Sequence, residues 1–151
     1  MIVYSVIAFF LENIYSLLFN NTNTYPLFFL VTLLLVYQKY DILDTKYIIY
    51  LIILGLFYDI VYTNIYIDTI LFPVLGFLNI IYKKNVNDNI LLNGLFIVVA
   101  LTLYEIMFYG LFCMLSLNEF SILVYLKTLI YVLIPNLIYY IIMKFILRRS
   151  R

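Results

Sequence analysis

Histidine and tryptophan are absent from this sequence, cysteine occurs once, and only 11% of the residues are charged. The single cysteine, Cys113, cannot form an internal disulfide bond, and no spacing typical of metal ligands is present. The glycines are dispersed, so there is no phosphate-binding loop, and no catalytic motif of the Ser/His/Asp, Cys/His or HExxH type occurs. The formal net charge of +1 does not favour nucleic-acid binding. We therefore expect no enzymatic activity, no metal and no cofactor.

Apolar residues predominate in the sequence. They make up 67% of the chain, whereas soluble domains contain roughly 45–50%. The apolar residues form blocks, such as residues 47–58 and 129–134, while the strands of a membrane β-barrel alternate apolar and polar residues. Blocks favour helices in lipid, because each helix satisfies its backbone amides within its own segment. The sequence thus predicts an all-α integral membrane protein.

The length of 151 residues fits a single transmembrane domain. At roughly 20 residues per span, about six helices use the whole chain and form a compact bundle. The connections between them are short and polar or charged. The expected spans cover residues 2–19, 25–37, 47–62, 66–82, 90–115 and 122–147.

Lysine and arginine residues alternate between the expected connections and so predict the orientation. The first charged connection, residues 38–46, holds Lys39 and Lys46, and the second, residues 83–89, begins with two lysines. Four more basic residues are Lys144, Arg148, Arg149 and Arg151. By the positive-inside rule, both termini and both charged connections face the cytoplasm in a multi-pass plasma-membrane protein.

Among the charged residues of the expected spans we single out four, namely Glu12, Asp59, Glu105 and Lys127. Each costs roughly 2.5–3.5 kcal/mol at a helix centre on insertion scales, so it must pair, protonate or face water. We expect Lys127 to pair with one or more of the acids in the bundle interior. Two interpretations stay open: a relay or ligand cavity, or a buried pair that fixes helix assembly or docks a partner helix.

The neighbours of these charges favour an inward orientation. Ala8 and Glu12, together with serines one turn before and one turn after them, form a stripe of small and polar residues that permits close helix approach. Glu105 shares a helix face with Tyr109, which brings the tyrosine hydroxyl within reach of the carboxylate. In the last span, Pro135 removes a backbone hydrogen bond and is expected to kink the helix.

Two segments carry a resemblance to a known family. Residues 55–59 (GLFYD) and 72–78 (FPVLGFL) resemble the central part of the rod shape-determining membrane protein MreD family. Residues 134–138 (IPNLI) are similar to the final helix of that family. The family often has a glycine soon after the aspartate, whereas residues 63–66 contain none.

The resemblance implies a non-enzymatic scaffold of the bacterial cell-elongation machinery, which supports rod shape and peptidoglycan synthesis. Its expected partners are an MreC-like bitopic protein, MreB-like filaments, peptidoglycan synthases and the bilayer. The expected fold resembles the substrate-binding subunits of energy-coupling-factor transporters. The inward charges would then hold the bundle together or receive the MreC helix, and the two charged connections would lie within reach of the filaments.

The same fold leaves two other functions open, because a fold does not decide a function. One is a vitamin-like small-molecule binding subunit of a transporter, with a polar cavity lined by Glu12, Asp59 or Glu105. The other is an ion or proton conductor, in which Asp59 would be required for flux.

Overall fold

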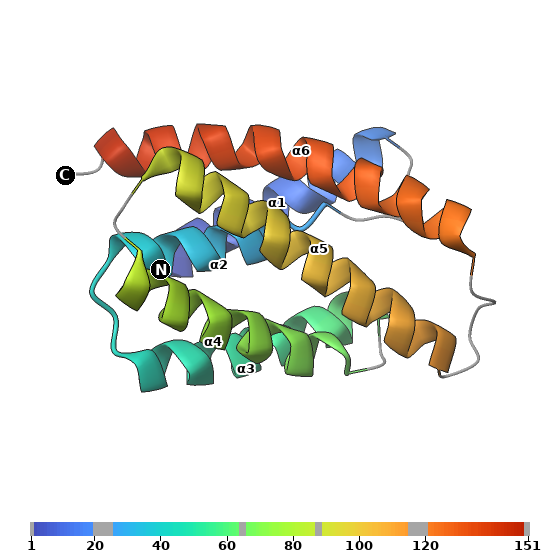
Figure 1. Cartoon of the computed structure of the whole chain (residues 1–151), viewed down its shortest axis with the longest axis horizontal. Helices are drawn as coiled ribbons and strands as arrows, with labels where there is room; N and C mark the ends of the chain where they lie inside the picture. Colours follow the sequence, from blue (N-terminus) through green and yellow to red (C-terminus); the bar gives the residue numbers. More distant parts are fainter. Residues whose placement is uncertain (1, 20–25, 64–65, 87–88, 115–120, 150–151) are drawn as a thin grey trace.

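The computed structural model describes residues 2–19, 26–63, 66–86, 89–114 and 121–149. These residues form six α-helices and one π-helical turn, with no strand among them, which confirms the expectation of an all-helical fold. The helices run along the long axis of the molecule, and both chain ends lie at the same end of it (Figure 1). The elements are α1 (Ile2–Phe19), α2 (Phe28–Lys39), α3 (Asp44–Tyr58), η1 (Asp59–Thr63), α4 (Asp68–Asn85), α5 (Ile90–Met114) and α6 (Ile122–Arg149).

The two charged connections are shorter than the sequence suggested. α2 begins at Phe28 after Pro26 and Leu27, and α3 already begins at Asp44, an acid that suits the positive end of a helix dipole. Parts of the charged connections expected at 38–46 and 83–89 are therefore helix ends. The polar residues 20–24, the connection 116–120 and Arg151 lie outside the described residues.

α2 is the central helix. Every residue from Phe28 to Tyr37 is buried, and the helix packs against α1, α4 and α6. Its contact with α6 includes the ring of Phe28, which stacks on Tyr139 at a centroid distance of 4.5 Å. A hydrogen bond of 2.7 Å between the hydroxyls of Thr32 and Tyr139 lies beside this stack. A helix of 12 residues, apolar all round, is thus enclosed by the other helices.

α3 and α4 form a closely packed hairpin. At Gly76 on α4, an added Cβ atom would overlap with Cδ1 of Leu51 on α3. Asn79, one turn further along α4, donates a hydrogen bond to the carbonyl oxygen of Leu34 and another to the hydroxyl of Tyr47. The lack of a side chain at Gly76 lets α4 approach α3 closely, and the buried Asn79 amide bonds α4 to both α2 and α3.

The surface of the molecule is strongly apolar, and several polar groups are inside. Leu17, Leu91 and Leu123 are each about three-quarters exposed or more, with 81%, 76% and 77% of their surface accessible. Glu12 and Asp59 are fully buried. Within the described ranges, three helical segments are long and apolar enough to cross a membrane: Asp44–Tyr62, Ile90–Leu111 and Ile122–Arg148.

Candidate functional site

Glu12 on α1 caps the start of α2. The first turn of a helix has backbone N–H groups without partners, and a carboxylate is a strong acceptor for them. The residue that precedes α2, Leu27, has no side chain that could serve. Oε2 of Glu12 instead accepts a hydrogen bond of 3.1 Å from the backbone N–H of Phe29, and Oε1 accepts one from the Tyr58 hydroxyl on α3. One buried acid thus joins α1, α2 and α3.

Asp59 does the same for α4. Ile67, which precedes α4, offers no side-chain cap. Asp59 accepts hydrogen bonds from the backbone N–H of Asp68 at 3.0 Å, from the N–H of Thr69 at 2.7 Å and from the Thr69 hydroxyl at 2.6 Å. Gly55 makes this approach possible, because a Cβ there would lie 2.6 Å from the carbonyl oxygen of Asp68. Gly55 and Asp59 therefore together fix the start of α4: the glycine permits the close approach, and the aspartate accepts the hydrogen bonds.

Asp68 is a third buried acid, which the sequence analysis did not single out. It lies in the first turn of α4 and is fully buried. Its Oδ1 accepts a hydrogen bond of 2.5 Å from the hydroxyl of Tyr104 on α5. Its Oδ2 has no hydrogen-bond partner among the described residues. A second acid only nine residues after Asp59, across a short connection, was the signal available in the sequence.

These groups form one unit, which we call the acid–tyrosine core and define as Glu12, Tyr58, Asp59, Asp68 and Tyr104. Aromatic rings from α2 and α4 link its members. Phe29 stacks on Tyr58 at 5.8 Å, and Phe72 lies 5.5 Å from Tyr58 and 6.5 Å from Tyr104 between ring centroids. The core thus connects five helices at the end of the bundle where α2 and α4 begin (Figure 1).

Glu105 lies outside this network. It is half-buried on α5, and within the described residues it has neither a hydrogen bond nor an ion pair. The Tyr109 hydroxyl contacts the backbone of Ser121, whose N–H donates to it at 3.2 Å. The contact that the sequence suggested between Tyr109 and the Glu105 carboxylate is therefore replaced by one with the start of α6.

Lys127 does not pair with any of the three expected acids, and that expectation is wrong. Its side chain is exposed on α6, with Nζ 6.0 Å from the centroid of the Tyr131 ring. The physical reason is its helix face: Leu123 and Ile130, one turn on either side, are also exposed. In the described part of the chain, the ion pairs are instead Lys83–Asp41 and Lys84–Asp44.

Pro135 lies inside α6, which continues through it from Ile122 to Arg149. The next residue, Asn136, is fully buried, and its side-chain Nδ2 donates to the carbonyl oxygen of Val132 at 2.8 Å. A side-chain donor therefore supplements the backbone bonding in the turn where proline removes a backbone N–H. The kink expected at Pro135 stays a prediction.

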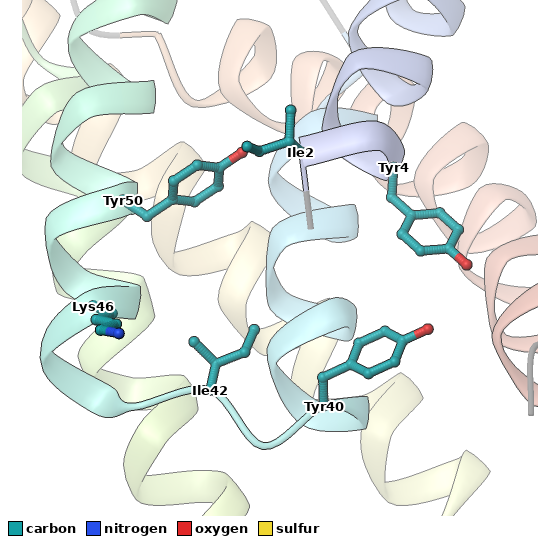
Figure 2. A pocket seen from close by; sticks show the side chains of 6 residues that line it. All are labelled: Ile2, Tyr4, Tyr40, Ile42, Lys46 and Tyr50. Carbon is teal, nitrogen blue, oxygen red and sulfur yellow. The ribbon is translucent and has the colours of Figure 1, made fainter.

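The structure contains a cavity of about 440 Å³ where α1 and α3 begin, at the opposite end of the bundle from the starts of α2 and α4 (Figure 1). It opens between the start of α1, the connection after α2 and the start of α3 (Figure 2). None of the acids singled out in the sequence lines it. Its lining residues are Ile2, Tyr4, Tyr40, Ile42, Lys46 and Tyr50.

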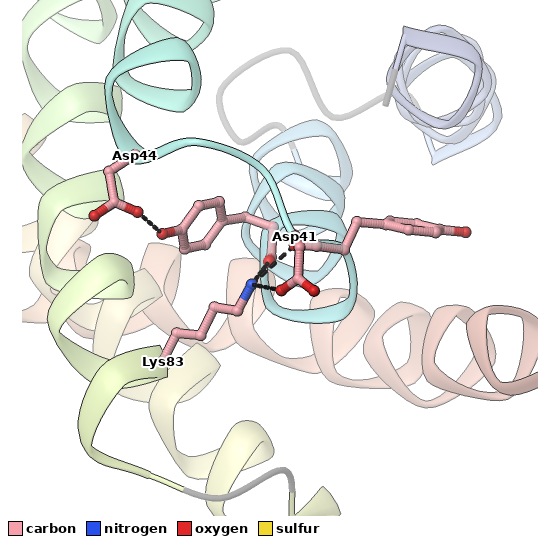
Figure 3. Close-up of polar contacts among 5 residues, drawn as sticks. Asp41, Asp44 and Lys83 are labelled. Carbon is pink, nitrogen blue, oxygen red and sulfur yellow. Dashed lines mark hydrogen bonds and ion pairs between the residues drawn. The ribbon is translucent and has the colours of Figure 1, made fainter.

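Beside the cavity, two lysines of α4 hold the ends of α2 and α3. Lys83 Nζ donates hydrogen bonds of 3.0 and 2.8 Å to the carbonyl oxygens of Tyr37 and Tyr40 and lies 3.6 Å from a carboxylate oxygen of Asp41 (Figure 3). These carbonyls belong to the last turn of α2, where a cation is favoured by the helix dipole. Lys84 contacts Asp44 at 2.6 Å. The two charged connections thus neutralise part of each other's charge.

No three residues of the types His, Cys, Asp and Glu are grouped to hold a metal ion within the described ranges. Comparison with known proteins gives no match to a family model, a curated protein or a solved structure. The resemblance of residues 55–59 and 72–78 to the MreD family therefore stays a prediction from the sequence.

Proposed function

We propose that this chain is a multi-pass membrane protein whose six helices span the bilayer with both termini in the cytoplasm. The distribution of apolar surface supports this. Large apolar side chains are exposed along α1, α3, α5 and α6, while Glu12, Asp59 and Asp68 are buried. Soluble monomers rarely expose contiguous apolar patches larger than a few hundred Å², whereas acids inside a membrane bundle face its interior.

Lysines and arginines support the orientation. Lys39, Lys83 and Lys84 lie in last turns of helices, Lys46 lies in the first turn of α3, and Arg148 lies near the end of α6. These helix ends share one end of the bundle (Figure 1), as the positive-inside rule requires of a cytoplasmic face. We call this the basic end.

Topology reporters test the membrane proposal. Alkaline phosphatase fused within residues 20–25 or 115–120 should be active, and a fluorescent protein fused after Arg151 should fluoresce in the cytoplasm. Carbonate washing should leave the protein in the membrane fraction. Release of the protein by carbonate, or the opposite reporter pattern, contradicts the proposal.

We propose further that the protein is a non-enzymatic scaffold of the bacterial cell-elongation machinery, as its resemblance to the MreD family implies. One observation carries this proposal: the buried carboxylates are engaged with other helices of the same chain. Glu12 and Asp59 bond to the backbone of α2 and α4, and Asp68 bonds to Tyr104 on α5. Such contacts stiffen a bundle and favour a fixed docking platform over a transport pathway.

Lys127 marks the helix face that we propose for the bitopic, MreC-like partner. It is exposed among the apolar side chains Leu123, Leu126, Ile130 and Ile134 of α6. A cation on a lipid-facing surface is costly, and a partner helix that brings a polar or acidic group would offset that cost. The same face offers apolar side chains for packing.

Co-purification tests the scaffold proposal. The tagged protein should retain an MreC-like bitopic protein from its own cells, and its depletion should turn rods into round cells. Lys127→Gln should lower the recovery of the partner, whereas Lys144→Gln, which removes a charge near the other end of α6, should leave it unchanged. Normal shape after depletion, together with no recovered partner, contradicts the proposal.

The alternative of a vitamin-like binding subunit finds less support. It calls for a polar cavity lined by Glu12, Asp59 or Glu105, but Glu12 and Asp59 are buried against helix backbones, and the cavity lies elsewhere. A ligand screen by thermal shift separates the two functions. A large shift with a small polar ligand, abolished by Glu105→Gln, favours the binding subunit.

A further inference from the structure

The cavity at the basic end combines one cation with apolar and amphipathic side chains. Lys46 and Tyr50 are one turn apart on α3, and Ile2 faces them from α1. In Figure 2, the ring of Tyr50 extends across the cavity toward Ile2. Its volume of about 440 Å³ is within the range of small-molecule sites, roughly 300–1,000 Å³.

Lys46 differs from the neighbouring lysines in its partners. Lys83 and Lys84 are each paired with an aspartate. Lys46 is exposed and has no ion pair among the described residues. The two acids closest in sequence, Asp41 and Asp44, are those already paired with the α4 lysines. The ammonium group of Lys46 is therefore available to an external anion at the mouth of the cavity.

The surroundings of the cavity suit a lipid better than a soluble anion. The outer faces of α1 and α3 next to it carry exposed apolar side chains, among them Val3 and Val6 on α1 and Ile49 and Ile53 on α3. Tyrosines at the mouth are the residues favoured where lipid meets water. Basic pockets between transmembrane helices on the cytoplasmic side bind anionic head groups.

We propose that this cavity binds the head group of an anionic phospholipid, with its phosphodiester at Lys46 and its acyl chains along the outer faces of α1 and α3. The site rests on the proposed membrane location. It would anchor the start of α1 to α3 at the end where the charged connections lie.

Native mass spectrometry of the full-length protein in detergent tests the site. With equal amounts of phosphatidylglycerol and phosphatidylcholine, the protein should retain phosphatidylglycerol preferentially. Lys46→Gln should lower that retention about fivefold, which corresponds to about 1 kcal/mol. Lys39→Gln is the matched control, because Lys39 is an exposed lysine of the same end that does not line the cavity.

A second variant tests the cavity itself without changing the charge. Ile42→Trp should fill the space and lower retention of phosphatidylglycerol, while the melting temperature shows that the fold is intact. Equal retention of the two lipids, an equal loss in Lys46→Gln and Lys39→Gln, or displacement of the lipid by excess inorganic phosphate would overturn the proposal. The topology reporters are independent of this result, so a failed lipid site and a failed membrane assignment remain distinguishable.

Discussion

The acid–tyrosine core and the region around Glu105 and Lys127 use charged residues in different ways. In the core, Glu12 and Asp59 each accept a hydrogen bond from the first turn of another helix. On α5 and α6, Glu105 is half-buried and Lys127 is exposed, and neither forms an ion pair within the described residues. Charged side chains therefore link helices in the first region, whereas in the second region they form no ion pair among the described residues.

The difference follows from where helices begin. α2 and α4 start inside the bundle without a side-chain cap of their own, and an unpaired backbone N–H costs free energy wherever water is excluded. Acidic side chains from other segments accept hydrogen bonds from these N–H groups. Among the residues that the structure describes, no backbone N–H of a helix start bonds to Glu105 or Lys127. We expect the first region to determine stability and the second to determine interactions.

The largest loss of stability should come from Asp59→Ala. The substitution leaves the N–H groups of Asp68 and Thr69 and the Thr69 hydroxyl without their buried acceptor. At about 1–3 kcal/mol for each unsatisfied group, we expect a loss of about 3–5 kcal/mol in the free energy of unfolding. Equilibrium unfolding in mixed micelles measures it.

Asp41→Ala is the control for this experiment, because the Asp41 side chain is fully exposed. It should leave the unfolding curve unchanged. If both variants unfold alike, Asp59 is not the cap of α4 and the comparison between the two regions fails.

Gly55→Ala should have the second-largest effect. The added Cβ would meet backbone atoms of Asp68 and Thr69 at 2.6–3.0 Å, and backbone cannot move aside as a side chain can. Overpacking of this kind costs about 1–3 kcal/mol. Gly110→Ala is the matched control: among the described residues, no atom beyond its chain neighbours and its own helix backbone lies within 4 Å of its Cβ position, and alanine is the better helix former. Thermal melting should fall for the first variant and stay level or rise for the second.

The sequence was sufficient for the helices but not for their partners. Apolar blocks and charged connections predicted six helices, and α1 has the expected bounds because polar residues follow it directly. The stripe with Ala8 and Glu12 predicted the buried face of α1 correctly, since both residues are fully buried. Helix bounds and the buried face of a helix can be predicted in this way because both depend on the order of apolar and polar residues within one segment.

The contacts between segments were harder to predict from the sequence. Glu12 and Phe29 are 17 residues apart, and nothing in either segment indicates that one caps the other. The pairing proposed for Lys127 failed because opposite charges in neighbouring spans do not reveal which helix faces meet. Tyr66 adopts a left-handed φ of 60° before α4, in the stretch where the resembling family often has a glycine, and a tyrosine gives no hint of that conformation.

Tyr58→Phe tests the hydrogen bond at the centre of the core and should have a moderate effect. The ring stays stacked on Phe29, and only the hydroxyl that donates to Glu12 is lost. Because a hydrogen bond contributes about 0.5–1.5 kcal/mol, and about 1.5–3 kcal/mol where the acceptor is charged, the free energy of unfolding should fall by about 1.5 kcal/mol. Tyr131→Phe, on an exposed ring, should cause no shift. An equal effect of the two changes would mean that the Glu12 contact contributes nothing.

The smallest effect on stability should come from Lys127→Glu, although it reverses a charge within a segment long and apolar enough to cross a membrane. An exposed side chain without an ion pair among the described residues leaves no buried group unsatisfied when it changes. Lys83→Glu makes the same change where Nζ bonds the last carbonyls of α2, so it should lower the melting temperature in detergent. If Lys127→Glu melts as early as Lys83→Glu, the region around Lys127 is structural after all. If it melts like the unmodified protein but no longer recovers the bitopic partner, its charge acts outside the chain, which is the distinction between the two regions.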